Sequence, residues 1–223
     1  MLLGPDTGDA ITITIGAFGA TADQLNSIIG STSVKVIATA VTEITTTHEK
    51  LYGDGGVGAV TGLVNDTDNI DLLGDGNTVG SYNVVVDDVT LDASKVNQIA
   101  TGTTGTVNAT ALTTVTGTLS DLDAMVGDND VFFAIGEAVA NYAVTISANA
   151  SAEADKLSAV VGDTTGEVDA KLITKIVGNS TDLKNIQADG SFVHNTTPDY
   201  AVEIVEDTGF SSVADINSIK GNT

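Results

Sequence analysis

The chain has 223 residues, of which 42% are hydrophobic and only 4% aromatic, and it contains neither Trp nor Cys. Its 30 Asp and Glu residues outnumber 8 Lys residues, and Arg is absent, so the formal net charge is −22 at pH 7. Binding to nucleic acid or anionic lipid depends on Lys and Arg neutralising phosphates, so we expect neither as a partner. The lack of Cys excludes disulfides, thiol nucleophiles and thiolate metal sites.

No apolar segment approaches the roughly 18 residues that a membrane span requires, so we expect no membrane insertion. The N-terminal residues Met1–Asp6 lack the basic start and the apolar stretch of a signal peptide. We therefore expect export, if it takes place, to use a signal outside this sequence or a route that needs none.

The sequence repeats one block three times in the same register and then begins a fourth copy. Three segments align without a gap: Leu25–Leu51, Val96–Leu122 and Leu157–Leu183. Self-similarity of this kind is typical of arrays, in which each unit buries its apolar face against its neighbours. We therefore expect one repeat array over residues 1–223, with units at about 9–80, 81–140 and 141–198 and a partial unit at 199–223.

Each copy opens with a run that alternates in the manner of a β-strand and is rich in β-branched residues and Tyr. The four runs are Ile11–Ile15, Tyr82–Val86, Tyr142–Ile146 and Tyr200–Val205. A short helix is expected after each run, because pairs of apolar residues spaced three apart lie on one helix face. The pairs are Leu25 and Ile28, Val96 and Ile99, Leu157 and Val160, and Ile216 and Ile219. The expected caps of these helices are Thr21, Asp92, Ser151 and Ser212.

A second strand and a second short helix complete each copy. The strand is expected over Val36–Ile44 and its equivalents, and the helix around Leu51, Leu122 and Leu183. A strand that is joined through a helix to the next strand makes a parallel pair with a right-handed crossover. The pattern therefore predicts an α/β fold, a repetitive right-handed strand–helix solenoid with parallel strands. The alternative is an all-β repeat protein or β-solenoid.

Residues at equivalent positions of such a solenoid are expected to stack in columns. The columns are Val36/Val107/Val168, Ala38/Ala109/Ala170 and Leu25/Val96/Leu157/Ile216. The fourth copy has one strand and one helix, so the C-terminal end is expected to expose unpaired backbone groups and an apolar layer. We expect self-association or a partner protein to cover that open end.

The long acidic connector after the first copy's second helix carries the one hypothesis for a metal site. Asp66, Asp68, Asp71 and Asp75 crowd this connector, and Ca²⁺ takes six to eight oxygen ligands. An EF-hand would require an oxygen ligand at position 70 and Gly at position 71, where the chain has Ile70 and Asp71. A solvated acidic loop is the alternative, and no other cofactor is expected.

The sequence contains no arrangement that indicates an enzyme. His48 and His194 are the only histidines, they occupy non-equivalent positions, and both are expected to be solvated at the surface. There is no G-x-S-x-G nucleophile turn and no H-E-x-x-H metal helix. The rival hypothesis is a carbohydrate-active enzyme, because solenoids carry paired carboxylates that act as acid and base. The chain has few aromatic residues to line the groove of such an enzyme.

Two segments carry a resemblance to known proteins: Val107–Thr118, with the pattern V-x-A-x-x-L-T-T-V-T-G-T, and Tyr142–Ser147. They resemble Thr/Ala/Gly/Asp-rich repeats in very large surface or secreted proteins of aquatic bacteria, cyanobacteria especially. Similar segments occur in virion appendage proteins of phages that infect such hosts. The resemblance implies an extracellular structural or adhesive repeat at a cell surface or on a virion, and it assigns no functional residue.

The sequence thus predicts a non-enzymatic structural or adhesion repeat module at a bacterial cell surface. The alternatives are a phage virion decoration or appendage protein and a carbohydrate-binding or carbohydrate-active solenoid. The net charge of −22 opposes broad face-to-face association, so end-to-end contact is the expected geometry of self-association.

Overall fold

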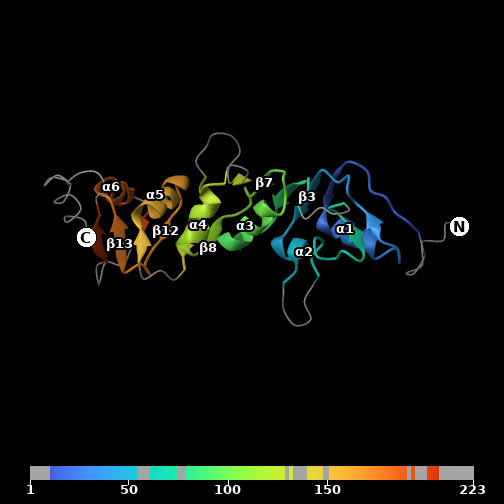
Figure 1. The fold of residues 1–223 in the computed structure, drawn as a ribbon, viewed down its shortest axis with the longest axis horizontal. Coiled ribbons are helices and arrows are strands. Elements are labelled where there is room, and N and C mark those ends of the chain that lie inside the picture. Colours follow the sequence, from blue (N-terminus) through green and yellow to red (C-terminus); the bar gives the residue numbers. More distant parts are fainter. Residues whose placement is uncertain are drawn as a thin grey trace. The chain divides into compact units, whose positions relative to one another are not determined.

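The computed structural model describes residues 11–54, 61–74, 79–128, 131–132, 140–147, 151–189, 192–193 and 200–205. Within these ranges the chain forms an α/β fold with six helices and fifteen strands. The chain divides into two compact units, whose elements are labelled in Figure 1. The first unit comprises the described residues within 1–88, 98–111 and 130–132, and the second comprises those within 89–97, 112–129 and 133–223.

Each of the first three copies contributes two helices, as the apolar spacing predicts. The helices are α1 (Ala22–Ile29), α2 (His48–Tyr52), α3 (Ala93–Thr101), α4 (Leu119–Val126), α5 (Ala154–Asp163) and α6 (Ser180–Ala188). Of the predicted anchor pairs, those of α3 and α5 are buried, which confirms that one face of each of these helices packs on the core. In α1 Leu25 is buried but Ile28 is only half-buried, and Ile216 and Ile219 lie outside the described residues.

The caps of the first helices agree in part with the prediction. Thr21 and Asp92 cap α1 and α3 through side-chain oxygens that accept backbone N–H bonds at 3.2 and 3.0 Å. Ser151 does not cap α5, which begins after Glu153 without a side-chain cap bond. Ser212 lies outside the described residues.

The strands form four sheets, and every pairing within a sheet is parallel. The first unit holds one sheet in the order β1 (Gly19–Thr21), β3 (Glu43–Thr46), β5 (Asn83–Val86), β7 (Val107–Asn108), β9 (Val131–Phe132), and the pair β2 (Val36–Ile37), β4 (Ile70–Asp71). The second unit holds one sheet in the order β14 (Phe192–Val193), β12 (Val168–Asp169), β10 (Ala143–Ile146), β8 (Thr114–Gly117), β6 (Thr90–Asp92), and a second in the order β11 (Ala152–Glu153), β13 (Lys175–Gly178), β15 (Ala201–Ile204).

Each five-stranded sheet is built from two successive copies of the repeat. With unit boundaries near residues 80 and 140, β1 and β3 belong to the first copy, and β5, β7 and β9 belong to the second. The other five-stranded sheet combines β6 and β8 of the second copy with β10, β12 and β14 of the third. The strand that opens the second or third copy, β5 or β10, therefore lies in the middle of a five-stranded sheet. We call β5, β10, β15 and the equivalent run Ile11–Ile15 the opening strands, although the predicted strand Ile11–Ile15 forms only an isolated bridge at Thr14.

The buried columns of these sheets mix different positions of the repeat. One column consists of Ala20, Ile44, Val84, Val107 and Val131, all of them buried. The predicted column Val36/Val107/Val168 is wrong: the three residues are fully buried, but they lie in three different sheets. The reason lies in the sequence separation of paired residues. Thr90 pairs with Thr114, for example, and this separation is much shorter than one copy of the repeat. The other two columns stay predictions, and Ile216 of one of them lies outside the described residues.

The predicted second strand Val36–Ile44 is two strands in two different sheets. A turn over Ala38–Val41 separates β2 from β3, closed by a bond of 3.1 Å from the Val41 N–H to the Ala38 carbonyl. The third copy has the same turn between β12 and β13, with a bond of 2.9 Å. Ala38 and Val41 are both buried, so apolar residues continue through the turn and make it resemble a strand in sequence.

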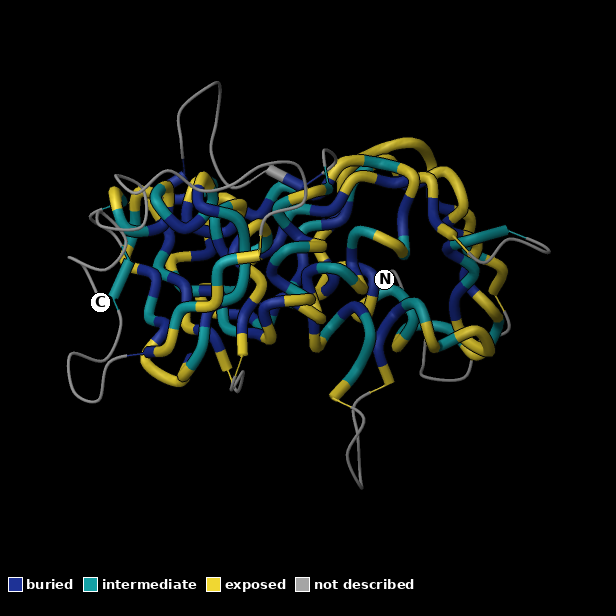
Figure 2. Tube along the Cα trace, turned by 60° about the vertical axis from the view of Figure 1, so that its left-hand side comes forward, coloured by how far each residue is buried: buried dark blue, intermediate teal, exposed yellow. Residues whose placement is uncertain are grey.

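Aliphatic side chains dominate the core of each unit, in keeping with the low aromatic content. Figure 2 shows buried segments of the chain enclosed by segments of intermediate and full exposure. Tyr82 and Tyr142 are the largest fully buried side chains, and both directly precede opening strands. Among the described helices, none has the length and apolar character needed to cross a membrane.

Candidate functional site

Two buried threonines join neighbouring turns of the chain. Thr103 and Thr164 occupy equivalent positions after α3 and α5, and they are 7% and 4% exposed. The Thr164 hydroxyl donates to the carbonyl oxygen of Tyr142 at 2.6 Å, and the Thr103 hydroxyl donates to that of Tyr82. Each hydroxyl also accepts the backbone N–H two residues later at 3.0 Å. Because these buried hydroxyls are satisfied within the protein, their geometry indicates a structural role.

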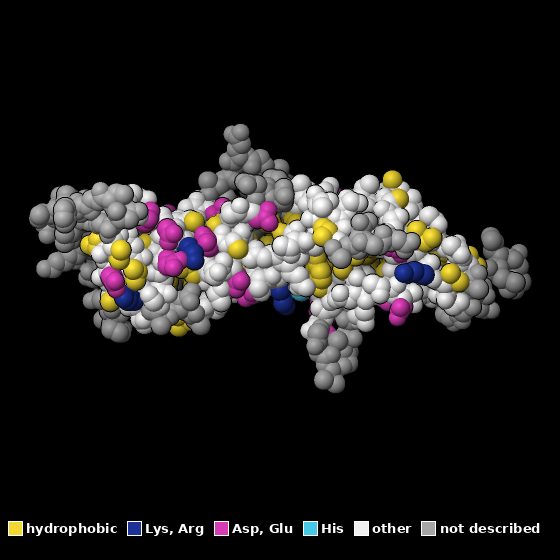
Figure 3. Space-filling view, viewed as in Figure 1, with side chains coloured by type: hydrophobic (Ala, Val, Ile, Leu, Met, Phe, Trp, Pro, Cys, Tyr) yellow, Lys and Arg dark blue, Asp and Glu magenta, His cyan; other side chains and the backbone are white. Residues whose placement is uncertain are grey.

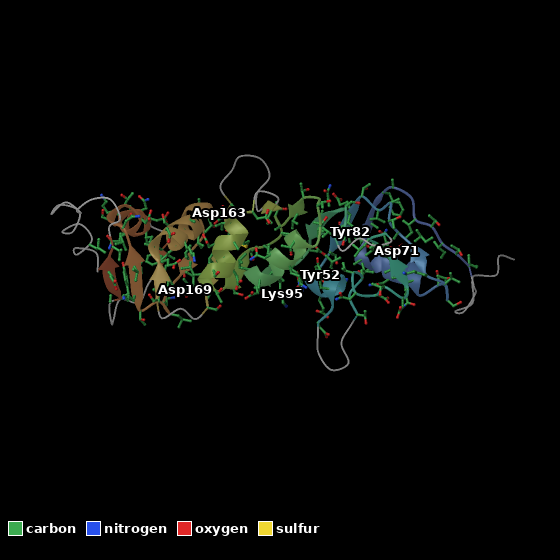
Figure 4. All side chains as sticks on the ribbon, in the orientation of Figure 1. Tyr52, Asp71, Tyr82, Lys95, Asp163 and Asp169 are labelled. Atoms are coloured by element: carbon green, nitrogen blue, oxygen red, sulfur yellow. The ribbon has the colours of Figure 1, made fainter. Side chains whose placement is uncertain are left out.

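The tyrosines bonded to these two threonines differ in the partner of their hydroxyl group. Figure 4 labels Tyr82, Tyr52 and Asp163, which take part in the comparison. Tyr142 donates to the Asp163 carboxylate at 2.6 Å, and burial followed by this bond raises the pKa of Tyr142 above its ordinary value of 10.0. Tyr82 is equally buried and burial raises its pKa, but its hydroxyl has no partner among the described residues. The second copy has Gly102 in place of Asp163, and a Cβ there would lie 1.8 Å from the Tyr52 hydroxyl. Tyr52 therefore occupies the space of the missing acceptor.

The histidine that the structure describes is part of the packing. His48 is 6% exposed, so the expectation of a solvated surface histidine is wrong for this residue. Its Nε2 lies 2.8 Å from Gln98 Oε1, and its backbone N–H donates to the Asp88 carboxylate at 2.8 Å. The imidazole ring also packs against the Tyr52 ring, with 5.4 Å between the ring centroids. His194 lies outside the described residues.

The acidic connector uses two of its four predicted ligands for local bonds. Asp66 accepts from a side-chain amide three residues later at 2.8 Å, and Asp71 accepts from a backbone N–H three residues later at 2.7 Å. Asp68 is exposed, and Asp75 lies outside the described residues. Within the described ranges, no three His, Cys, Asp or Glu side chains gather in a way that would hold a metal ion. The calcium site at these four residues stays a prediction.

A hollow of about 230 Å³ lies between α4 and α5. Its lining consists of Asp123, Val126, Gly127, Ala159, Gly162 and Asp163. It is smaller than the ~300–1,000 Å³ usual for ligand pockets, and no aromatic side chain lines it. The Asp163 carboxylate is already engaged by the Tyr142 hydroxyl, which limits its use as a base.

The surface carries far more acidic than basic side chains, and Figure 3 shows this on one face. The ion pairs found among the described residues are Lys50–Asp23, Lys156–Glu153, Lys171–Asp169 and Lys175–Glu203. The side chains of all four pairs are at least partly exposed, so water and salt screen their attraction and the pairs add little to stability. With 8 Lys residues against 30 acids, most carboxylates cannot have a basic partner.

No protein-family model matches this sequence, and no curated protein matches it significantly.

Proposed function

We propose that the protein is a non-enzymatic structural or adhesion repeat module at a bacterial cell surface. The observation that supports this proposal is that buried polar side chains bond to other parts of the chain. Thr103, Thr164 and His48 bind backbone carbonyls or an amide on other turns of the chain. In an enzyme, polar side chains with shifted pKa values converge on a cavity. Here the buried polar groups hold one turn of the repeat to another.

We also propose that the parallel sheets belong to a right-handed strand–helix solenoid. Parallel neighbours joined through a crossover are right-handed in nearly all proteins. In each five-stranded sheet, every pair of neighbouring strands is joined by a crossover segment. Small-angle X-ray scattering tests this architecture, because a solenoid gives the profile of an elongated particle. The profile of a sphere would contradict it.

Labelling of intact cells tests the location. Antibodies against the protein are expected to bind intact cells of the producing organism without permeabilisation. Label on purified phage particles, with none on cells, would favour the virion alternative. Label that appears only after permeabilisation would contradict both extracellular hypotheses.

A polysaccharide digestion assay tests the rival enzymatic function. A glycosidase needs two carboxylates about 5–10 Å apart in a groove, and the hollow that contains Asp123 and Asp163 is the best candidate among the described residues. We expect no release of reducing ends from any polysaccharide. Turnover that is lost in Asp123→Asn but kept in the control Asp128→Asn would overturn the proposal.

A calcium-stabilised binding module is the second candidate, favoured by the acidic connector. A cation bound only by the folded state raises stability as its concentration increases. The melting temperature is expected to rise with Ca²⁺ and to rise less in the Asp68→Asn variant, with Mg²⁺ as the ionic control. Identical melting curves in Ca²⁺ and Mg²⁺ would remove this candidate.

A further inference from the structure

The two opening strands inside five-stranded sheets have neighbours on both edges. β5 pairs with β3 and β7, and β10 pairs with β8 and β12. On the second edge, the Val84 N–H donates to the Thr106 carbonyl at 2.9 Å, and the Val144 N–H donates to the Glu167 carbonyl at 2.8 Å. Val84 and Val144 are both 1% exposed, so a neighbour on each edge accompanies full burial.

The opening strand of the fourth copy has only one of these neighbours among the described residues. β15 pairs with β13 over Ala201–Ile204. The Ala201 and Val205 N–H groups donate to the carbonyls of Thr174 and Gly178 on the β13 side. Because N–H groups alternate along a parallel strand, the Val202 N–H, equivalent to those of Val84 and Val144, faces the outer edge of β15. Val202 and Ile204 are only half-buried, although their equivalents in β5 and β10 are buried. The outer edge of β15 therefore has the form of a docking edge for one more parallel strand.

The opening strand of the first copy has the complementary arrangement. Thr14 pairs with Ile37 of β2 through an isolated parallel bridge. The Ile15 N–H donates to the Ile37 carbonyl at 2.7 Å, and the Ile37 N–H donates to the Ile13 carbonyl at 2.9 Å. No described strand lies on its other edge, and Ile11 is 49% exposed. This run has a neighbour from its own copy and none from a preceding copy, whereas β15 has the reverse.

We propose that the protein assembles head to tail, with β15 of one molecule replacing residues 11–15 beside β2 of the next molecule. In this arrangement β15 has β13 of its own molecule on one edge and β2 of the next molecule on the other. The two molecules then share one sheet in the order β11-β13-β15 of the first and β2-β4 of the second. This is the five-stranded order that the chain forms twice within itself. A second copy is the expected occupant because β2 and β4 are equivalent to the strands that fill this place in both complete sheets.

The complete sheets fix the register of the contact. The pairs are Val84 with Val107 and Val144 with Val168 within the chain, and Val202 with Val36 between molecules. Glu203 then lies opposite Ile37 of the next molecule. Lys35 directly precedes β2 and is two residues before Ile37, so an extended continuation of the pairing brings its positive charge diagonal to Glu203.

The contact joins two different surfaces, so it is heterologous and produces either a ring or an open filament. Repulsion between molecules of charge −22 opposes it, and salt screens that repulsion. We therefore expect association to strengthen as salt is raised. This inference does not depend on where the protein acts, so its failure would leave the proposed function standing.

Cysteine cross-linking tests the register, because the natural chain has no Cys. Ile37 and Glu203 are exposed, so Ile37→Cys and Glu203→Cys should leave the fold intact. Mixing the two single variants under mild oxidation is expected to give a disulfide dimer faster than either variant alone. The double variant is expected to give a ladder of covalent oligomers. The matched control pairs Ile37→Cys with Thr145→Cys, an exposed position on β10 whose second edge is already filled by β12.

A proline variant tests the edge itself. Val202→Pro removes an N–H that faces the outer edge of β15, so the melting temperature should change little. Self-association measured by sedimentation is expected to weaken roughly tenfold or more, because the new inter-strand bond cannot form. In contrast, Ala201→Pro removes the bond to the Thr174 carbonyl and should lower the melting temperature. A protein that is monomeric at all concentrations and salts, with equal cross-linking in the control pair, overturns the proposal.

Discussion

Tyr82 and Tyr142 occupy equivalent buried positions and differ in what their hydroxyl groups contact. A buried hydroxyl that is bonded contributes about 1 kcal/mol, more when its partner is charged, whereas an unbonded one costs free energy. We expect Tyr142→Phe to lower the free energy of unfolding by about 1–2 kcal/mol. We expect Tyr82→Phe to leave it unchanged or to raise it. Urea denaturation of both variants measures the difference, and equal losses would mean that Tyr82 has an acceptor.

Alkaline pH should destabilise the protein through the same tyrosines. Their pKa values are raised in the folded state above the ordinary value of 10.0, mainly by burial. The neutral hydroxyl is therefore favoured by folding, and this stability is fully present below pH 10 and lost as pH rises above it. We expect the free energy of unfolding to fall from about pH 10 upward, and to fall less steeply in Tyr142→Phe. A flat profile to pH 12 would contradict this.

At the residue scale, the sequence did not predict the buried polar contacts of Thr103, Thr164 and His48. The repeated Thr-Thr-Gly of the second and third copies was a usable signal, because a buried Thr between turns recurs with the repeat. His48 was wrongly placed at the surface because its partners Asp88 and Gln98 are 40 and 50 residues away. Contacts across such distances depend on how the sheets align, which local patterns do not specify.

At the scale of elements, the buried strand β7 offers a test of the core. Val107 has no exposed surface and pairs with Val84 and Val131. We expect Val107→Asp to cost about 3–5 kcal/mol, because it buries a charge without a partner. The control Leu172→Asp, at a side chain 59% exposed, is expected to change stability by less than about 0.5 kcal/mol. Thermal denaturation of the two variants compares them, and equal effects would contradict this position of β7.

The six described helices and the opening strands β5, β10 and β15 could be predicted from sequence, because a period of three or two within a few residues reports local burial. The predicted strand Ile11–Ile15 is reduced to a single bridge at Thr14. The division of Val36–Ile44 into two strands could not be predicted, because the turn over Ala38–Val41 keeps its apolar residues buried. The sharing of sheets between copies was also missed. Ungapped repeats indicate that equivalent residues have equivalent surroundings, but they do not indicate which strands pair.

For the whole molecule, charge repulsion is the dominant electrostatic effect. A net charge of −22 favours expanded states through self-repulsion. Sodium chloride screens exposed charges over distances of about 10 Å at 0.1 M. We expect the melting temperature to rise between low salt and about 0.5 M NaCl at neutral pH, because screening weakens this repulsion. A melting temperature that falls with salt would mean that the few ion pairs outweigh the repulsion.

The sharing of sheets between copies has a mechanical consequence. In a chain of separate domains, each domain can unfold under load while its neighbours stay intact. Here β5, β7 and β9 of the second copy are hydrogen-bonded into one sheet with β1 and β3 of the first. Unfolding one copy under load therefore requires breaking the hydrogen bonds between its strands and those of the neighbouring copy. Load on one copy is transmitted to the next through backbone hydrogen bonds, so the overlap resists extension in a way that linked separate domains do not.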